Sequence, residues 1–381
     1  MRYLFLLIPL AGAAVVYRAG YTNYTLLVSL TLSFFFLIGV IIIARGWLRD
    51  TVLVLATIVL CLVGIEAYEV ITNKRSLAEL PHDFADSRPI LGWGPITAGT
   101  FNAKKMDPKT GRLIYDTTYT IGNHLLRKTS SAESGPTVAF FGDSFMFGEG
   151  LPDRETLPQM FSDIMNRKLH VLNFAFSGYG PQQFLRALET RMYDDLLRDA
   201  RLFVFETAPW HAERTACSPP FTLRAPRYVL KDGNPVYVGA CAEGLTRVAR
   251  EILGHSAAYR ALVQPAQGAP SRAAIDLYIA IIGRAARLAR EQYNVPTLVL
   301  YLPYTTTYLE ASGYTNDEIM QRLRDGGAEV ISGWFNPADY PELTIVIPGD
   351  GHPTGAANRL WAEMIKSWLD RNGTTSIASP H

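Results

Sequence analysis

Three stretches near the N-terminus are almost continuously apolar. Residues 24–44 (YTLLVSLTLSFFFLIGVIIIA) carry no charge, and about 20 apolar residues in a helix suffice to cross the hydrocarbon core of a bilayer. Shorter uncharged runs lie on either side, at residues 3–17 and 51–65. The first run could instead be a secretory signal, but signals end at a small-residue cleavage site and are not normally followed at once by another span. We expect three transmembrane helices within residues 1–72.

The basic residues near these runs predict their orientation. Arg45 and Arg49 lie in RGWLRD, between the second and third runs, and cytoplasmic loops are enriched in Lys and Arg. This loop is therefore expected inside and the chain after the third run outside, although Arg18, Lys74 and Arg75 would then be external. We expect a multi-pass protein of a bacterial inner membrane whose larger part faces the periplasmic or extracellular side.

Beyond residue 72, charged and apolar residues alternate as they do in soluble globular proteins. Residues 73–136 combine turn-forming sequences with short β-like pieces, for example DPKTGR followed by RLIYDTTYTI. This pattern predicts an accessory β-rich segment that packs on the domain after it. Its residues suggest no chemistry.

From residue 137 onward, short apolar runs rich in β-branched residues alternate with segments of helical period. Strands are predicted at residues 137–142, 170–176, 201–208, 296–304 and 343–349, and helices at 156–168, 181–197, 271–293 and 354–371. Strands buried on both faces and separated by helices indicate a parallel sheet with right-handed crossovers. We predict a three-layer α/β domain over residues 137–381, with an insert at about 212–270.

Ser144 follows the first predicted strand, in TVAFFGDSFMFGEG. In open parallel sheets, functional groups gather beyond the carboxyl ends of the strands, and the amides that open the next segment could stabilise an oxyanion there. Gly-Asp-Ser alone is a weak signal, because Asp and Ser also favour turns and helix N-termini. Ser144 is therefore either a displayed nucleophile or a residue that begins a helix.

His352 favours the first interpretation. It lies in PGDGHPT, between the last predicted strand and the last predicted helix, and a nucleophilic serine requires such a base. Asp350 precedes it by two residues, so an extended backbone would turn both side chains to the same side and let the carboxylate hold the imidazole. The alternative is that His352 only caps the final helix.

With a serine after the first strand, an Asp/His pair near the C-terminus and no G-x-S-x-G elbow, the chain resembles the SGNH (GDSL) hydrolase family over residues 137 to about 372. The resemblance implies a flavodoxin-like fold and serine ester hydrolysis or acyl transfer. It implies Ser144 as the nucleophile and His352 as the base, with Asp350 as its partner. It also implies an oxyanion hole formed by the amides of Ser144 and of Gly178, in NFAFSGYG.

Two features depart from the family pattern. The third motif, which normally supplies an asparagine to the oxyanion hole, reads ETAPWHAERT here, so His211 or Arg214 would have to replace that donor. Loss of one such donor costs roughly 10² to 10³ in rate. His211 could instead bind substrate or be structural. The acid also stands two residues before the histidine, whereas the usual spacing of three falls on Gly349.

Cys217 and Cys241 are the cysteines that lie beyond the apolar runs, one of which contains Cys61. The segment RYVLKDGNPVYVGA between them is typical of a β-hairpin around an Asp-Gly-Asn turn. A disulfide would clamp the base of this hairpin and would fit an oxidising compartment such as the periplasm. Two unrelated buried thiols are the alternative.

Composition and motifs argue against nucleic-acid binding, a metal site and a nucleotide cofactor. The formal net charge of +1 provides no footprint for a polyanion, so nucleic acid is not an expected partner. Neither HExxH nor paired CxxC occurs and the remaining histidines form no ligand spacing, so no metal is predicted. FGDSFMFGEG matches neither G-x-G-x-x-G nor a P-loop, so no nucleotide cofactor is expected.

These features favour a membrane-anchored serine esterase that removes O-acyl groups, above all O-acetyl groups, from envelope or exported glycans. Asp143, Trp210 and Arg214 are candidate substrate contacts. One alternative is an O-acyltransferase of a cell-surface polysaccharide, which would need a membrane-protein partner or a soluble acyl donor. Another is a non-catalytic SGNH-like subunit of a membrane complex, favoured by the missing asparagine.

Overall fold

The computed structural model describes residues 24–72, 78–263 and 269–372. The chain divides into two compact units, one of residues 1–75 and 243–268 and the other of residues 76–242 and 269–381. Residues 243–268, expected within the insert of the α/β domain, thus group with the apolar N-terminal helices.

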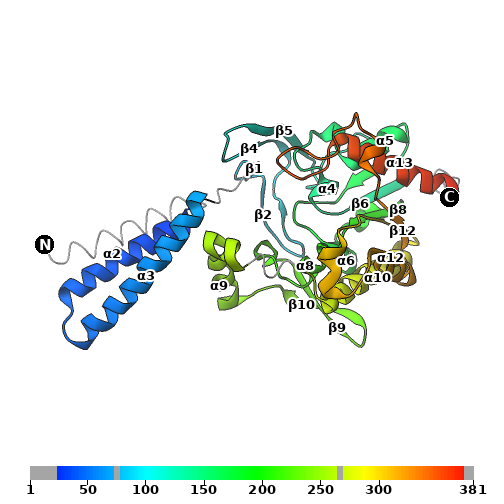
Figure 1. Ribbon diagram of the computed structural model, residues 1–381. Helices are drawn as coiled ribbons and strands as arrows, with labels where there is room; N and C mark the ends of the chain where they lie inside the picture. Colours follow the sequence, from blue (N-terminus) through cyan, green and yellow to red (C-terminus); the bar gives the residue numbers. More distant parts are fainter. Residues whose placement is uncertain (1–23, 73–77, 264–268, 373–381) are drawn as a thin grey trace. The chain divides into compact units, whose positions relative to one another are not determined.

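The first unit contains a helical hairpin. Helices α2 (Thr25–Ile43) and α3 (Trp47–Thr72) run side by side (Figure 1), and both are long and apolar enough, by length and composition, to cross a membrane. They correspond to the second and third predicted spans. The run at residues 3–17, expected as the first span, lies outside the described residues. Helix α9 (Gly244–His255) and the π-helical turn η3 (Tyr259–Val263) complete the described part of this unit.

The second unit is built on a five-stranded parallel sheet in the order β12-β11-β8-β6-β7. Its strands are β6 (Thr137–Phe141), β7 (His170–Asn173), β8 (Ala200–Thr207), β11 (Thr297–Tyr301) and β12 (Glu329–Ser332). Numbered in chain order within this sheet, the arrangement is 2-1-3-4-5, the flavodoxin-like order whose switch point lies between the first and third strands. The predicted fold class is confirmed.

Helices cover both faces of this sheet, which explains why its strands read as continuous apolar runs. On one face α5 packs against α13, and on the other α10 packs against α6, α8 and α12 (Figure 1). Every residue of β6 and β11 is buried. The helices are α4 (Ser144–Phe147), α5 (Leu157–Ile164), α6 (Pro181–Glu189), α7 (Asp194–Leu197), α8 (His211–Thr215), α10 (Arg272–Tyr293), α11 (Thr306–Leu309), α12 (Asn316–Asp325) and α13 (Gly355–Asn372).

The strand predicted at residues 343–349 is wrong. The fifth strand is β12, which pairs with β11 from Leu298–Glu329 to Tyr301–Ser332, whereas the later run contributes only an isolated bridge between Val346 and Pro353. Val346 is 49 % exposed, so this run lacks the two buried faces of the other strands. The β-branched residues of the run do not by themselves distinguish a strand from an extended loop.

The accessory segment packs on the α/β part. Strands β1 (Ala78–Glu79), β4 (Gly99–Met106) and β5 (Leu113–Ile121) form one sheet, and β2 (Ala85–Arg88) pairs with β3 (Gly92–Pro95). The ring of Phe84 packs in a T-shaped arrangement against Phe147 and in a tilted one against Phe176. Arg127 is fully buried and donates to the carbonyl oxygens of Phe147, Gly148 and Leu151. The accessory segment therefore fixes the loop that follows α4.

A disulfide joins Cys217 and Cys241, the pairing that the sequence suggested. Between them lies the hairpin of β9 (Pro226–Lys231) and β10 (Asn234–Ala240). Its turn residues Asp232 and Gly233 have φ angles of 50° and 76°, as the favoured two-residue hairpin turns require.

Candidate active site

The local structure separates the roles of Asp143 and Ser144. Asp143 is the N-cap of α4, because its side chain accepts a hydrogen bond from the amide of Phe145 at 2.8 Å. Ser144 is the first helical residue and retains 8 % exposure. The capping function that could have explained Ser144 therefore belongs to its neighbour, and the serine hydroxyl is left for another partner.

That partner is His352. Ser144 Oγ lies 2.9 Å from His352 Nε2, and His352 Nδ1 lies 2.5 Å from Asp350 Oδ2. The structure thus brings Ser144 to the Asp350–His352 pair, although Ser144 and His352 are 208 residues apart in the sequence. An ionised Asp350 accepts a hydrogen bond from the Nδ1–H group, which leaves Nε2 to accept from the serine hydroxyl. This is the geometry that a nucleophile, its base and the orienting acid require.

A tight turn, rather than the expected extended backbone, orients Asp350 and His352. Gly349 and Gly351 have φ angles of 81° and 98°, in the left-handed region that glycine adopts without strain. The amide of Ile347 donates to the carbonyl oxygen of His352 at 2.8 Å and closes the turn. The two glycines therefore allow a spacing of two residues to bring carboxylate and imidazole together.

Charges around the imidazole favour its protonated form. Burial alone would lower the pKa of His352, but the hydrogen bond that His352 donates to Asp350 and the nearby carboxylate of Glu149 outweigh burial and raise this pKa. Glu149 Oε2 lies 3.8 Å from His352 Nε2 and accepts a hydrogen bond from Ser177 Oγ at 2.7 Å. Two carboxylates therefore face the imidazole, one at each nitrogen.

Lys105, on β4 of the accessory segment, also joins this group. Its ammonium forms an ion pair with Asp350 Oδ1, and only 13 % of its side chain is exposed. Burial would raise the pKa of Asp350, but its hydrogen bonds with His352 and Lys105 outweigh burial and lower this pKa to about 2. The contacts of Lys105 and Glu149 could not be predicted from the sequence. The lysine is 245 residues from its partner, and Glu149, although it follows Ser144 closely, holds no position that a motif assigns.

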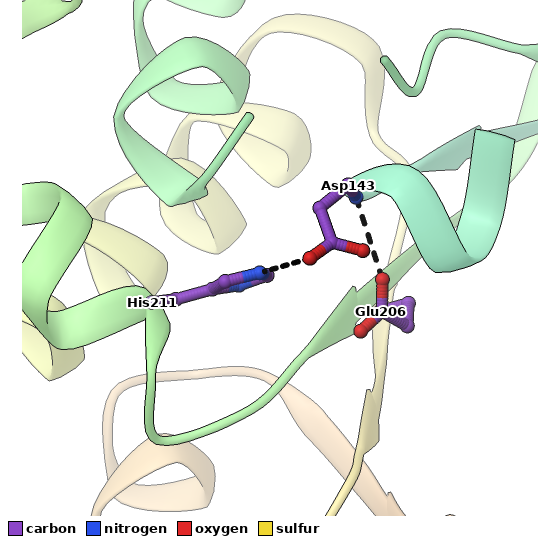
Figure 2. Close-up of side chains that lie close together, drawn as sticks. All are labelled: Asp143, Glu206 and His211. Carbon is purple, nitrogen blue, oxygen red and sulfur yellow. Dashed lines mark hydrogen bonds and ion pairs between the residues drawn. The ribbon is translucent and has the colours of Figure 1, made fainter. Parts of the chain in front are cut away.

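Behind Ser144 lies a fully buried polar cluster of Asp143, His211 and Glu206 (Figure 2). His211 Nε2 donates to Asp143 Oδ2 at 3.1 Å, and His211 Nδ1 accepts from Thr207 Oγ1 at 2.8 Å. Both ring nitrogens are engaged away from the nucleophile. His211 is therefore not placed as the oxyanion donor or substrate ligand that the sequence suggested, and its third interpretation, a structural role, fits these contacts.

Arg214 supplies the positive charge of this cluster. Its Nη1 donates to Asp143 Oδ2 at 2.8 Å and also to the carbonyl oxygen of Tyr179. Burial would raise the pKa of Asp143, but Arg214 and the hydrogen bond from His211 outweigh it and lower this pKa. Asp143 is fully buried and bonded on both sides, so the expected substrate contact by Asp143 is wrong.

The same cluster could be considered for a metal, because ligand atoms of Asp143, Glu206 and His211 lie within 4.8 Å of one another. The guanidinium of Arg214, however, already occupies the Asp143 oxygen that a cation would use. Burial and the nearby charge of Asp143 raise the pKa of Glu206 well above its ordinary value, which disfavours the ionised form that a cation would need. Its Oε2 accepts from the amide of Asp143 at 3.4 Å. The donor set fits a hydrogen-bonded support for α4 better than a cation site.

Two backbone amides remain available as hydrogen-bond donors. The hydrogen bonds of the described residues include no acceptor for the amide of Ser144 or of Gly178. Gly178 has φ of 80°, and a Cβ there would lie 3.2 Å from the ring of Phe221, so the loop requires glycine. Hydrogen bonds hold this loop on either side of Gly178. The hydroxyl of Ser177 donates to Glu149, and the carbonyl oxygen of Tyr179 accepts from Arg214.

A row of aromatic rings leads away from the imidazole. The ring of Phe145 lies 5.4 Å from that of His352 and 5.6 Å from that of Trp210, and Trp210 lies 5.3 Å from Tyr304. Trp210 is half-buried and Tyr304 is 47 % exposed. Trp210 is thus linked to His352 through the ring of Phe145, and its contact with substrate stays a prediction.

Neither a protein-family model nor a curated protein matches the chain. Solved structures do. A member of the lipolytic protein G-D-S-L family from Veillonella parvula is 12 % identical, with 62 % of this chain and 98 % of that chain covered and a TM-score of 0.37. The esterase EstA from Pseudoalteromonas sp. is 14 % identical (62 % and 99 % covered, TM-score 0.35). The salicylyl-acyltransferase SsfX3 is 13 % identical (65 % and 57 % covered, TM-score 0.35). Because these identities and TM-scores are low, the roles of residues are inferred from the contacts within this chain.

The Lys105→Met variant should raise the pKa of His352. Removal of the ammonium leaves the charge of Asp350 uncompensated, and the carboxylate then stabilises the imidazolium more strongly. Titration of the His352 ring protons by NMR measures the effect. Lys104→Met is the matched control, because adjacent residues of a strand point to opposite faces. An unchanged or lowered pKa in Lys105→Met would contradict the electrostatic role of this lysine.

Proposed function

We propose that the protein is a serine esterase that forms an acyl-enzyme on Ser144. The observation that carries this proposal is the continuous contact from Ser144 through His352 to Asp350, at 2.9 and 2.5 Å. The 8 % exposure of Ser144 and the 18 % exposure of the His352 side chain leave the reacting atoms accessible from solvent.

In the first step Ser144 Oγ attacks the ester carbonyl while His352 Nε2 takes the hydroxyl proton. The carbonyl oxygen becomes an oxyanion that the amides of Ser144 and Gly178 can bind, and preorganised donors of this kind supply a large part of catalysis. His352 then gives the proton to the leaving alcohol as the acyl-enzyme forms. Water, deprotonated by the same imidazole, attacks the acyl group, and the acid and free serine are released. Asp350 stabilises the imidazolium in both steps.

The substrate that we propose is an O-acyl ester, above all an O-acetyl ester, of an envelope or exported glycan. The row of Phe145, Trp210 and Tyr304 supports it, since partly exposed aromatic rings beside a nucleophile provide apolar surface for a sugar ring. The carboxylate of Glu149 can accept a hydrogen bond from a hydroxyl at the same place.

The proposed location is a membrane surface. Helices α2 and α3 would span the bilayer, and Arg45 and Arg49 in the loop between them favour the cytoplasmic side for that loop. Both far ends of the hairpin, and with them the catalytic unit, would then face the periplasm. The disulfide between Cys217 and Cys241 supports an oxidising compartment.

Substitution of Ser144 or His352 by Ala should abolish catalysis. We expect kcat/KM for an activated acetyl ester to fall by at least about 10³-fold in each, because nucleophile and base act as one unit. Ser332→Ala is the control, since Ser332 ends β12 at the same edge of the sheet but contacts no residue of the triad.

The assay also separates the competing functions when it includes an acetylated glycan and an acceptor glycan. Free acetate as the main product supports an esterase, whereas acetyl groups on the acceptor with little free acetate would show transfer. A wild-type protein that neither cleaves the ester nor reacts with a fluorophosphonate would exclude both and favour a non-catalytic subunit.

Activity should depend on pH through His352. The base must be neutral to accept the proton, and its pKa is raised above the ordinary value of 6.5, so kcat/KM should rise through a limb centred above that value. Glu149→Gln should move the limb to lower pH, because it removes one of the charges that stabilise the imidazolium. A limb below pH 6.5 in the wild type, or a limb that Glu149→Gln leaves in place, would count against this electrostatic description.

A further inference from the structure

Helix α9 presents an apolar side that no described residue covers. Leu245, Val248, Ile252 and Leu253 recur at helical spacing and are 87, 47, 52 and 45 % exposed. Arg247, Arg250 and Glu251 lie on the opposite side. An amphipathic helix that exposes its apolar stripe in this way is typical of a binding surface.

This helix is attached to a candidate membrane span. Glu66 of α3 is only 2 % exposed, although most of its helix neighbours are exposed apolar residues. Its Oε2 accepts from Ser256 Oγ at 2.8 Å and from the amide of Ala258 at 3.1 Å, and its Oε1 accepts from the amide of Ala257 at 2.6 Å. An ionisable residue in an apolar span requires such partners, and these three donors directly follow α9. Helix α9 also packs against α2.

The attachment point coincides with one end of the apolar hairpin. Glu66 lies roughly 28 Å along α3 from Trp47, at about 1.5 Å per residue, and the hydrocarbon core is about 30 Å thick. Trp47 is 78 % exposed at one end, and Tyr24 and Tyr68 are 53 and 65 % exposed at the other. Aromatic residues concentrate where hydrocarbon meets water. Glu66 therefore stands at the boundary marked by the two tyrosines.

We propose that α9 and η3 form an interfacial element that lies on the bilayer surface, with the apolar stripe among the acyl chains and Arg247 and Arg250 among the headgroups. Leu262 and Val263 of η3, 64 and 42 % exposed, extend the apolar surface beyond α9. The lipid surface is the proposed occupant because the stripe is attached, through Glu66, to helices whose own exposed residues are apolar. Helix α9 begins three residues after Cys241, so bilayer binding would tether the catalytic unit a second time. The proposal rests on the membrane anchoring proposed above.

The experiment uses the full-length protein in phospholipid nanodiscs that contain lipids spin-labelled in the acyl chain. A fluorophore is attached to Ile252→Cys or, as the matched control on the polar side, to Arg247→Cys, each in a Cys61→Ala background. The bonded Cys217 and Cys241 do not react. We expect lipid quenching at position 252 to exceed that at position 247 at least about threefold, with the opposite order for a water-soluble quencher.

A third sample separates failure of this proposal from failure of the anchoring. It carries the label on the native Cys61, which is exposed on α3. Quenching at Cys61 without quenching at position 252 would overturn the interfacial helix and leave the spans intact, and would make the stripe available to a protein partner. Absence of lipid quenching at both sites would overturn both. Glu66→Leu should reduce the contrast between positions 252 and 247 while Cys61 stays quenched, and an unchanged contrast would overturn the attachment through Glu66.

Discussion

The contact between the Ser144 hydroxyl and the His352 imidazole is the interaction on which the site depends. It joins the end of the first sheet strand to a turn just before the last helix, and it extends through Asp350 to Lys105 on the accessory sheet. Three segments that are distant in sequence must fold correctly before the chain of contacts exists. This explains why a β-rich segment without recognisable motifs accompanies the α/β part: it supplies the cation that faces the triad carboxylate.

The buried charge of Asp143, the residue before Ser144, is a second constraint on the site. Asp143 is buried with its charge intact, which is unfavourable unless every acceptor position has a donor. His211, Arg214 and the amide of Phe145 provide those donors. Because Arg214 also holds the carbonyl of Tyr179, one cation links the start of α4 to the loop of Gly178. Truncation of Arg214 would thus disturb the start of α4 and the loop of Gly178 together.

The sequence predicts the parts of this arrangement that local patterns encode. Alternating apolar runs and helical periods predicted the α/β class, and the residues around Ser144, His352 and Asp350 predicted the pieces of the triad. Contacts that depend on tertiary packing could not be predicted. Lys105 and Glu149 stand in ordinary strand and loop sequences, His211 adjoins the motif but turns into the core, and residues 343–349 have strand composition without a neighbour to pair with. The attachment of α9 to Glu66 is likewise a contact between two distant segments that neither local sequence predicts.

The central claim is that the amides of Ser144 and Gly178 bind the oxyanion of an acyl transfer while His352 acts as the base for Ser144. An experimental structure of the full-length protein after reaction with an ethyl fluorophosphonate tests it most directly. The account predicts phosphorus bonded to Ser144 Oγ, with the phosphoryl oxygen within hydrogen-bond distance of both amides. An adduct on another residue, or a phosphoryl oxygen directed away from both amides, would contradict it.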